Sequence, residues 1–413
     1  MQAHSLARHF AAVLVLVPAA FASTYTVDPA GGGNFTDIQT AILASQPGDV
    51  LLVQPGNYAP FALDRGLSIV GYGACRSGSI TIAGIPAGET AVIVRLEADD
   101  LGIQGCAGHV IVQDMQQVAN ISVTASPDVR FARIAMPTLD SSAPVDGFTA
   151  QGSRVEFVSS WVSGPGGSSC ATPALSGAVG ADCGSSRLHM THTSLRGGAG
   201  SSCAQQNYAC ASGGTGLDMH AGADVILCGG LSDVFQGGGA GINLFYGYCS
   251  FDGITGIPVL VRSGATLRRS GVDVRDWSYD TGPNCYHWVF PGVQLQGGTE
   301  NSPALADPCL SVSGNAAPGS SVQFLLDAPP GSSAILYFGR NAIVVTDPNI
   351  VIEQLAARAR TVNLGTIQAS GQGHFTWPIS AALTPGVKLF AQAEVTLASG
   401  EVRRTNSVPV VLH

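Results

Sequence analysis

Apolar residues occur along this chain mainly in short runs that are separated by turns rich in glycine, proline and aspartate. Examples are Leu67–Val70, Ala91–Leu96 and His109–Gln113, in which the apolar stretch is too short for a buried helix. Short apolar runs between turn residues are typical of β-strands. Because the runs recur at short intervals, the pattern predicts stacked coils, each built from a few short strands.

The N-terminal part of the pattern differs, because a helical period precedes the first strand. After a glycine-rich turn, Asn34 or Thr36 is placed to cap a short helix. The run Val50–Val53 then predicts a buried strand, and Pro55–Tyr58 predicts the next turn. The helix would present one apolar stripe at i, i+3, i+4 spacing, formed by Ile38, Ala41 and Ile42.

This opening segment resembles that of a known family. The strings GNFTDIQTAI (Gly33–Ile42) and GDVLLVQPGNY (Gly48–Tyr58) are similar to the start of pectin-lyase-like proteins, including pectin methylesterases. The resemblance implies a right-handed parallel β-helix whose N-terminal end is covered by the helix. Such a cover has a physical reason, since the first coil would otherwise expose its apolar interior and unpaired strand edges.

An internal repeat lies in the middle of the chain. Its copies begin at Ser153, Ser186, Ala223 and Ala265, with intervals of 33, 37 and 42 residues. Intervals of this length suit one coil plus an inserted loop, and glycine-, serine- and cysteine-rich stretches supply the loops.

The repeat predicts a column of side chains on one face. Ser163, Arg196, Asp233 and Arg275 each lie ten residues after a copy begins. Neighbouring parallel strands are about 4.8 Å apart, so the last three would form a ladder of alternating charge. The ladder is either an exposed row of ion pairs or a face that holds an acidic or hydroxyl-rich sugar chain.

Composition changes near Asn301–Pro303, after which the predicted strands become longer and alternate more regularly. Turns such as Thr384–Gly386 separate them, although Val351–Ala359 fits either a helix or a strand followed by a loop. This part resembles the C-terminal sandwich modules of exported bacterial proteins. We therefore predict an all-β chain: a right-handed parallel β-helix over 23–300, followed by a small antiparallel β-sandwich over 305–413.

The first 22 residues have the pattern of a secretory signal. Arg8 and His9 precede the apolar run Ala11–Phe21, and Ala20-Phe21-Ala22 supplies the small-x-small pattern of a cleavage site. We expect cleavage after Ala22 and a protein that is secreted or held at the cell surface. No later stretch is long and apolar enough to span a membrane.

The ten cysteines fit an oxidising compartment. Six of them lie between Cys170 and Cys249. Spacing does not determine how they pair; Cys203–Cys210 and Cys75–Cys106 are two candidate local closures. None belongs to a CxxC pair, so the sequence predicts no zinc site.

The net charge of the chain disfavours two classes of binding partner, nucleic acids and anionic membranes. The formal net charge is -9, and charged residues make up only 11% of the chain. Nucleic acids and anionic membranes attract clusters of basic residues, which this chain lacks. We expect a monomer whose partner is a polysaccharide or a cell-surface glycan, with no cofactor.

The catalytic motifs of the related enzyme families are missing. The carboxylate-bearing segments of pectin methylesterases and the paired aspartates of polygalacturonases have no clear counterparts. A polysaccharide lyase would need Ca²⁺ and a basic residue near the sugar's acidic proton. The candidate group for that role, or for a glycosidase, comprises Asp233, Asp273, Arg275 and Asp276.

Aromatic and histidine residues offer further candidates. Trp277 and Tyr279 have flat faces on which sugar rings stack, with Arg196 as a third binding candidate; alternatively, these aromatics cover the last coil. His189, His192 and His220 with Asp218 are a separate constellation. His189 and His192 are three apart in a predicted strand and so face opposite sides, which does not favour joint metal ligation. Two hypotheses result: a non-catalytic scaffold that binds polysaccharide or a surface partner, and a lyase or glycosidase acting on acidic polysaccharide.

Overall fold

The fold is described from a computed structural model. The structure describes residues 22–137, 140–141, 145–167, 175–200, 212–229, 234–236, 256–270, 273–275, 292–301, 308–339, 342–346, 351–355 and 358–413. The predicted signal segment and parts of several inserted loops lie outside these ranges.

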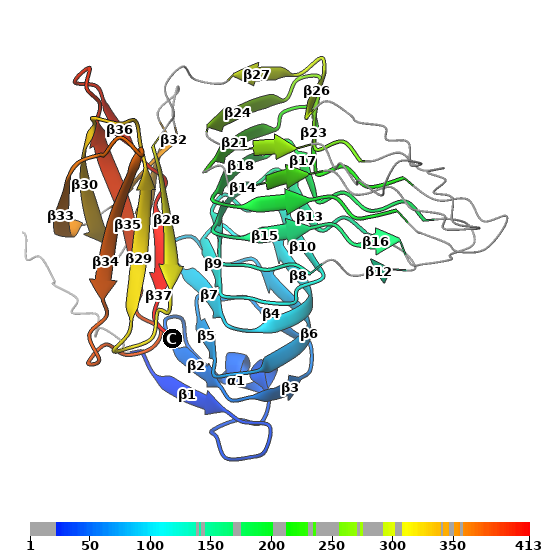
Figure 1. Ribbon diagram of the computed structural model, residues 1–413. Coiled ribbons are helices and arrows are strands. Elements are labelled where there is room, and N and C mark those ends of the chain that lie inside the picture. Colours follow the sequence, from blue (N-terminus) through cyan, green and yellow to red (C-terminus); the bar gives the residue numbers. More distant parts are fainter. Residues whose placement is uncertain are drawn as a thin grey trace, which may run out of the picture.

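Two long parallel sheets run through most of the chain (Figure 1). Successive coils contribute a strand to each sheet, so the sequence order of strands becomes the order within the stack. The 11-stranded sheet contains β1 (Thr24–Val27), β2 (Val50–Val53), β5 (Ser68–Gly71), β7 (Thr90–Val94), β9 (His109–Gln113), β11 (Val129–Ala132), β14 (Arg154–Val158), β18 (Arg187–Thr191), β21 (Asp224–Cys228), β24 (Thr266–Ser270) and β27 (Thr299–Asn301).

The opposite wall is the 10-stranded sheet, and shorter sheets complete the coils. The 10-stranded sheet contains β3 (Gly56–Tyr58), β4 (Phe61–Leu63), β6 (Cys75–Ala83), β8 (Glu97–Gln104), β10 (Asn120–Thr124), β13 (Phe148–Gln151), β17 (Ala181–Gly184), β20 (Leu217–Met219), β23 (Val259–Arg262) and β26 (Val293–Gln296). The four-stranded sheet contains β15 (Trp161–Ser163), β19 (Ser194–Arg196), β22 (Val234–Gln236) and β25 (Asp273–Arg275), and β12 (Asp140–Ser141) pairs with β16 (Gly166–Gly167). The predicted parallel β-helix is therefore confirmed.

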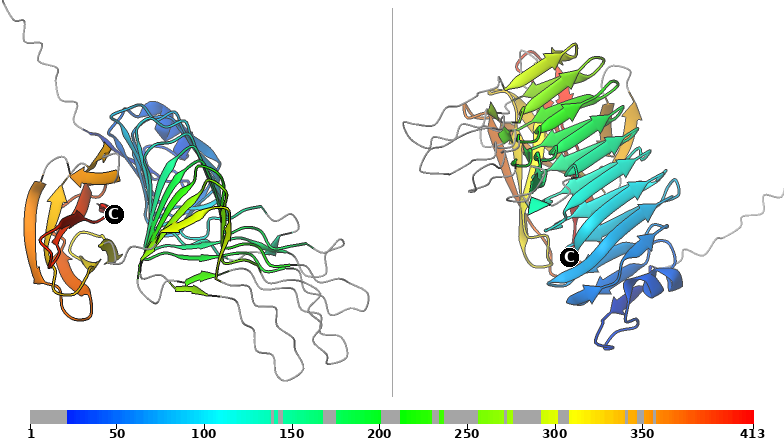
Figure 2. Two further views of the ribbon diagram at one scale, coloured as in Figure 1. Left: turned by 90° about the horizontal axis from the view of Figure 1, so that it is seen from above. Right: turned by 90° about the vertical axis from the view of Figure 1, so that its right-hand side faces the viewer.

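The helix at the N-terminal end is α1 (Ile38–Ala44), which lies at one end of the stack (Figure 2). Its predicted stripe is correct, since Ile38, Ala41 and Ile42 are buried. The predicted cap is wrong: Asp37, not Asn34 or Thr36, accepts a hydrogen bond from the Thr40 N–H. Asn34 instead accepts one from the Thr26 N–H at 2.8 Å, because the preceding turn folds back onto β1.

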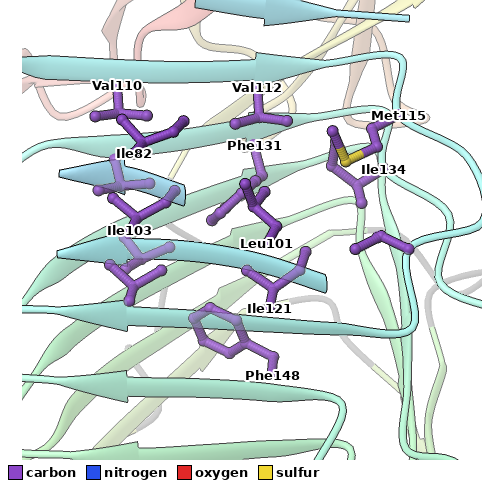
Figure 3. Close-up of a cluster of buried hydrophobic side chains, with 14 of the residues drawn as sticks. Ile82, Leu101, Ile103, Val110, Val112, Met115, Ile121, Phe131, Ile134 and Phe148 are labelled. Carbon is purple, nitrogen blue, oxygen red and sulfur yellow. The ribbon is translucent and has the colours of Figure 1, made fainter. Parts of the chain in front are cut away.

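The interior is filled by columns of apolar side chains that repeat from coil to coil (Figure 3). Parallel register places Ile82, Ile103 and Val123 one above another. Phe131, Phe148 and Phe157 pack together at the middle of the stack, with ring centroids 4.6 to 6.3 Å apart. Each strand thus contributes every second residue to the core, as its alternation requires.

Buried hydroxyl groups shape one corner of the coils. The preceding residue has a positive φ in each copy, and the following Ser126, Ser153 or Ser186 turns its hydroxyl toward the backbone. Ser153 Oγ accepts from the Ser126 N–H, and Ser186 Oγ accepts from the Ser153 N–H, both at 3.1 Å. This ladder explains why two repeat copies begin with serine.

The repeat copies stack in the predicted register. Arg154 pairs with Arg187, Arg187 with Asp224, and Asp224 with Thr266. In the last two coils the core columns change from apolar to charged residues: Arg269 in β24 follows Leu227, and Glu300 in β27 follows Leu267. These two charged residues form an ion pair with an Nε–Oε1 distance of 2.5 Å.

The C-terminal part consists of antiparallel strands, as predicted. Val351–Ala359, which the sequence left open between helix and strand, contains β32 and the start of β33. The strands are β28 (Cys309–Gly314), β29 (Ser321–Asp327), β30 (Ser333–Gly339), β31 (Ala342–Thr346), β32 (Val351–Leu355), β33 (Arg358–Thr366), β34 (Gln372–Pro378), β35 (Lys388–Thr396), β36 (Val402–Arg404) and β37 (Val408–Val411).

This sandwich lies beside the stack, against the outer face of the 11-stranded sheet (Figures 1 and 2). Val92 and Ile111 pack there against Phe390 and Val411 in a separate apolar cluster. Arg130, which is 2% exposed, donates to Ser407 Oγ at 2.6 Å and lies over the Phe390 ring. The sandwich therefore covers a face that would otherwise be open to a ligand.

A disulfide also joins the two parts, between Cys228 at the end of β21 and Cys309 at the start of β28. The Cys75–Cys106 pairing considered from the sequence is wrong, because both thiols are free and buried. Each sulfur instead contacts backbone carbonyl oxygens of its own or an adjacent coil. Cys203 and Cys210 lie outside the described residues.

Candidate functional site

The most exposed aromatic platform described on the β-helix is Trp161, at the first position of β15. Its side chain faces outward and is 47% exposed, whereas the next residue, Val162, is fully buried in the core. Strand alternation produces this arrangement. The neighbouring coils place Ala135 on one side of Trp161 and Ser194 on the other.

Two hollows meet at Trp161. The sandwich-side hollow, of about 570 Å³, lies between the β-helix and the sandwich; its lining includes Arg133 and His192 from the former and Gln323 and His374 from the latter. The arginine-side hollow, of about 390 Å³, is lined by Arg196, Gln117, Met136 and Pro137 among others. Both are lined by Gln116, Ala135 and Trp161, so we treat them as one feature, the Trp161 groove.

Arg196 brings a positive charge to the arginine-side hollow of the Trp161 groove. Its lining includes Arg133, Arg196, His192 and His374, and no aspartate or glutamate belongs to the described lining of either hollow. Burial lowers the pKa of the Arg196 guanidinium, yet a guanidinium keeps its charge at neutral pH. The groove thus differs from the chain as a whole, in which Asp and Glu number 28 and Lys and Arg 19.

Arg133 and His192 each lie against a carboxylate behind the groove. The Arg133 guanidinium donates two hydrogen bonds to Asp114, at 2.6 and 2.8 Å. His192 lies against the Asp327 carboxylate of the sandwich, with 2.5 Å between Nε2 and Oδ2. The His192–Asp327 contact joins the two parts of the protein at the wall of the sandwich-side hollow, whereas Arg133 and Asp114 both belong to the β-helix.

The chemistry available in the Trp161 groove is that of binding. An indole face offers an apolar surface for the C–H face of a sugar ring, and its N–H is a hydrogen-bond donor. Gln116, Gln117 and Gln323 bring amides that both donate and accept. Arginine adds a planar donor that suits carboxylate or sulfate oxygens.

A second, acidic region lies on the outer face of the 10-stranded sheet. A trough of about 670 Å³ there is lined by Ser79, Asp100, Asn120 and Asp146, among others. Burial raises the pKa of Asp146; a hydrogen bond from the Val179 N–H opposes the rise, and nearby carboxylates add to it. Asp100 accepts hydrogen bonds from Ser79 and Asn120, so its oxygens are already engaged.

The coils next to this trough carry a chain of charged side chains. His220 Nε2 lies 3.2 Å from Asp182 and 3.8 Å from Asp218, and Arg262 donates two hydrogen bonds of 2.7 Å to Asp218. The sequence constellation of His220 with Asp218 is therefore real as a contact, but its partners neutralise one another. Within the described ranges, the structure contains no group of three or more residues suited to a metal ion.

The histidines considered together in the sequence lie apart. His189 is on the outer face of the 11-stranded sheet, where burial, Arg154 and Arg268 lower its pKa to about 4. His192 is at the sandwich boundary and His220 follows β20 on the opposite wall. The three therefore cannot act as one site.

The predicted column on the four-stranded sheet is partly wrong. Ser163 pairs with Arg196 as expected, but Arg196 pairs with Gln236, which pairs with Arg275. Asp233 lies before β22 and is outside the column and the described residues. The reason is local: the segment between β21 and β22 is longer than the matching segments of the other coils, which shifts the column onto Gln236.

The other predicted site residues are located as follows. Arg196 lines the Trp161 groove. Asp273 and Arg275 lie in β25, but the structure does not describe their side chains; Asp276, Trp277 and Tyr279 lie outside the described residues.

Trp161 and Gln116 were missed by the sequence reasoning. The string SSWVSG contains the signal, because Trp161 occupies an outward position in a strand otherwise made of small residues there. A single exposed apolar side chain is common on protein surfaces, so this signal gains weight only from the two hollows beside Trp161, which the sequence does not reveal. Gln116 carries no such signal, since it lies between strands of the named sheets and its bridge to Ala135 is isolated.

Comparisons with known proteins leave the chain without an assigned family. No protein-family model and no curated protein matches it. A solved structure of Spo0M, a sporulation control protein from Bacillus subtilis, matches with 12% identity and a TM-score of 0.17; the match covers 26% of this chain and half of that one. A likeness at this level carries no argument about fold or function. In the described part of the chain, no helix has the length and apolarity needed to cross a membrane.

Proposed function

We propose that this protein is an exported, non-catalytic scaffold that binds an acidic polysaccharide in the Trp161 groove. The observation that carries the proposal is the half-exposed indole of Trp161 between two joined hollows. Ligand sites combine an apolar surface with a few polar groups that fix orientation, and the groove has both.

Charge supports an acidic ligand. The described lining of the groove contains arginines and histidines but no carboxylate, in a chain with a formal net charge of -9. Arg133 and His192 are paired with carboxylates behind the wall, so Arg196 is the cation in the lining that favours uronic-acid or sulfated chains over neutral ones. The acidic trough on the 10-stranded sheet has the opposite preference and would repel the same ligand.

The remaining parts of the proposal rest on the sequence. The resemblance of Gly33–Tyr58 to pectin-lyase-like proteins agrees with a parallel β-helix that handles polysaccharide. The signal pattern of residues 1–22 supports secretion or location at the cell surface, and we propose that the protein works there as a monomer.

The enzyme alternative has less support. A glycosidase needs two carboxyl groups roughly 5 to 9.5 Å apart on either side of the bond that breaks. The described lining of the Trp161 groove contains no carboxyl group. The alternative would instead rest on Asp233, Asp273, Arg275 and Asp276, whose side chains lie outside the described residues.

Calorimetric titration with polygalacturonate, alginate and neutral dextran tests the proposed function. The wild-type protein should bind the first two and not dextran, and release no reducing or unsaturated ends. Trp161→Ala should weaken binding at least about tenfold, equivalent to about 1.4 kcal/mol. Leu43→Ala, at an exposed position on α1, is the matched control and should bind normally. Equal binding by wild type and Trp161→Ala would refute the proposal.

A further inference from the structure

Ala135 lies between the two hollows of the Trp161 groove. It forms one bridge to Gln116 in the preceding coil and another to Trp161 in the following coil. Parallel strands are about 4.8 Å apart, so the backbones of Gln116 and Trp161 are separated by about 10 Å across Ala135. The small methyl group of Ala135 thus lies between two long side chains on adjacent coils.

These three residues are the ones that the two hollows share. A path from one hollow to the other therefore passes over Ala135, with Gln116 on one side and Trp161 on the other. Atoms in van der Waals contact are about 3.5 to 4 Å apart. The space over Ala135 consequently suits one sugar ring beside the indole, and not two rings side by side.

We infer that Ala135 determines specificity by letting a single unbranched chain cross from one hollow to the other. This inference rests on the proposed function and names the shape of the ligand. The ring over Ala135 stacks on Trp161 and accepts or donates hydrogen bonds at the Gln116 amide. One end of the chain then meets Arg196, and the other meets Gln323 and His374 of the sandwich.

The geometry has two consequences for the ligand. A chain that fills both hollows gains contacts that a short oligosaccharide in one hollow does not make, so affinity should rise with length until both are filled. A branch at the ring over Ala135 would collide with Gln116 or Trp161. The sandwich is then part of the binding site, because it supplies one wall of the sandwich-side hollow.

The test uses Ala135→Leu, which fills the passage, and Ala135→Ser as the matched control that does not. The probes are oligogalacturonates of increasing length, titrated into the full-length protein. In Ala135→Leu, long oligomers should bind at least about tenfold more weakly than in wild type. Short oligomers should lose less affinity than long ones, because Ala135 borders each hollow but only a long chain must cross it, and Ala135→Ser should behave as wild type at every length.

A polar blocking variant, Ala135→Gln, covers the case in which leucine impairs folding, and it should give the same dependence on length. Unchanged binding of long oligomers by both blocking variants would overturn the inference, and so would an equal loss for short and long oligomers. Failure of the wild-type protein to bind any oligomer would instead overturn the proposed function. The two failures are therefore distinguishable.

Discussion

Gln113 holds the backbone of Val411 by both ends of its side-chain amide. Gln113 Nε2 donates to the Val411 carbonyl at 2.9 Å, and the Val411 N–H donates to Gln113 Oε1 at 2.9 Å. Gln113 is fully buried at the end of β9, and Val411 ends the last strand of the sandwich. A side chain here replaces the neighbouring strand that β37 would otherwise need, and so joins the sandwich to the β-helix.

Loss of this amide should destabilise the whole protein. Gln113→Ala would leave the N–H of Val411 buried without a partner and its carbonyl with only the His413 Nδ1 contact at 3.4 Å, at a cost of about 2 kcal/mol. Chemical denaturation should show the loss, while Gln104→Ala, at the exposed end of β8, should leave the free energy of unfolding unchanged. Equal stability of the two variants would show that the contact contributes nothing.

The buried pair of Asp128 and Arg130 predicts a dependence of stability on pH. Burial alone would raise the pKa of Asp128, but Arg130 and a hydrogen bond from His109 outweigh it and hold the pKa well below its ordinary value. A carboxyl with a lowered folded-state pKa stabilises the fold above its unfolded pKa of about 4, and this contribution is lost as the pH falls further.

The variant Asp128→Asn should therefore be less stable than wild type at pH 7, by about 3 kcal/mol, because Arg130 keeps its buried charge. Its unfolding free energy should also fall less steeply below pH 4. Denaturation curves from pH 7 to pH 3 would measure both effects. Asp99→Asn, at an exposed ion pair with Arg76, is the control and should follow the wild-type curve.

The disulfide between Cys228 and Cys309 should also stabilise the assembled protein. It closes a chain segment with a sequence separation of 81 residues, which corresponds to up to about 4 kcal/mol in the chain-entropy model. Replacing both cysteines by serine should lower the melting temperature. Because a reductant acts on every disulfide in a protein, the double serine variant, and not reduction of wild type, isolates this bond.

Arg196 should control the salt dependence of ligand binding. Arg196→Gln removes one cation from the arginine-side hollow, so affinity for polygalacturonate should fall several-fold and depend less on ionic strength. Titrations at low and high salt would show both changes. Arg76→Gln removes a surface arginine distant from the groove and should alter neither quantity.

The sequence predicted those features that are periodic. Alternating apolar residues and the copies beginning at Ser153 and Ser186 specify strands and register, since a slip by one residue would turn the core columns outward. The same repeat failed at Asp233, because a longer segment before β22 changes the count without leaving a mark in the hydrophobic pattern. Local periodicity therefore predicts which side chains stack in a column only where the segments between strands have equal length in successive coils.

The position of the sandwich was beyond sequence reasoning. Gln113 reads as the ordinary end of a buried strand, and its partner Val411 is 298 residues away. The same holds for the Trp161 groove, whose sandwich-side hollow forms only when β28, β29 and β34 lie against the coils. The repeat allowed Arg196 to be predicted as a binding residue. That Trp161 and Gln116 lie beside it depends on how neighbouring coils pack, which the sequence pattern does not show.

The ion pair of Arg269 and Glu300 opposes end-to-end association of β-helices. A parallel stack that ended in leucines at these positions would offer the next molecule a template on which to build a fibre. A second molecule that stacked on this end would instead have to desolvate the charges of Arg269 and Glu300. Leu295 in the neighbouring column is 51% exposed, so the charged pair is what opposes stacking there. We expect the double change to leucine to make the protein polymerise end to end, which would be visible as light scattering that rises with concentration.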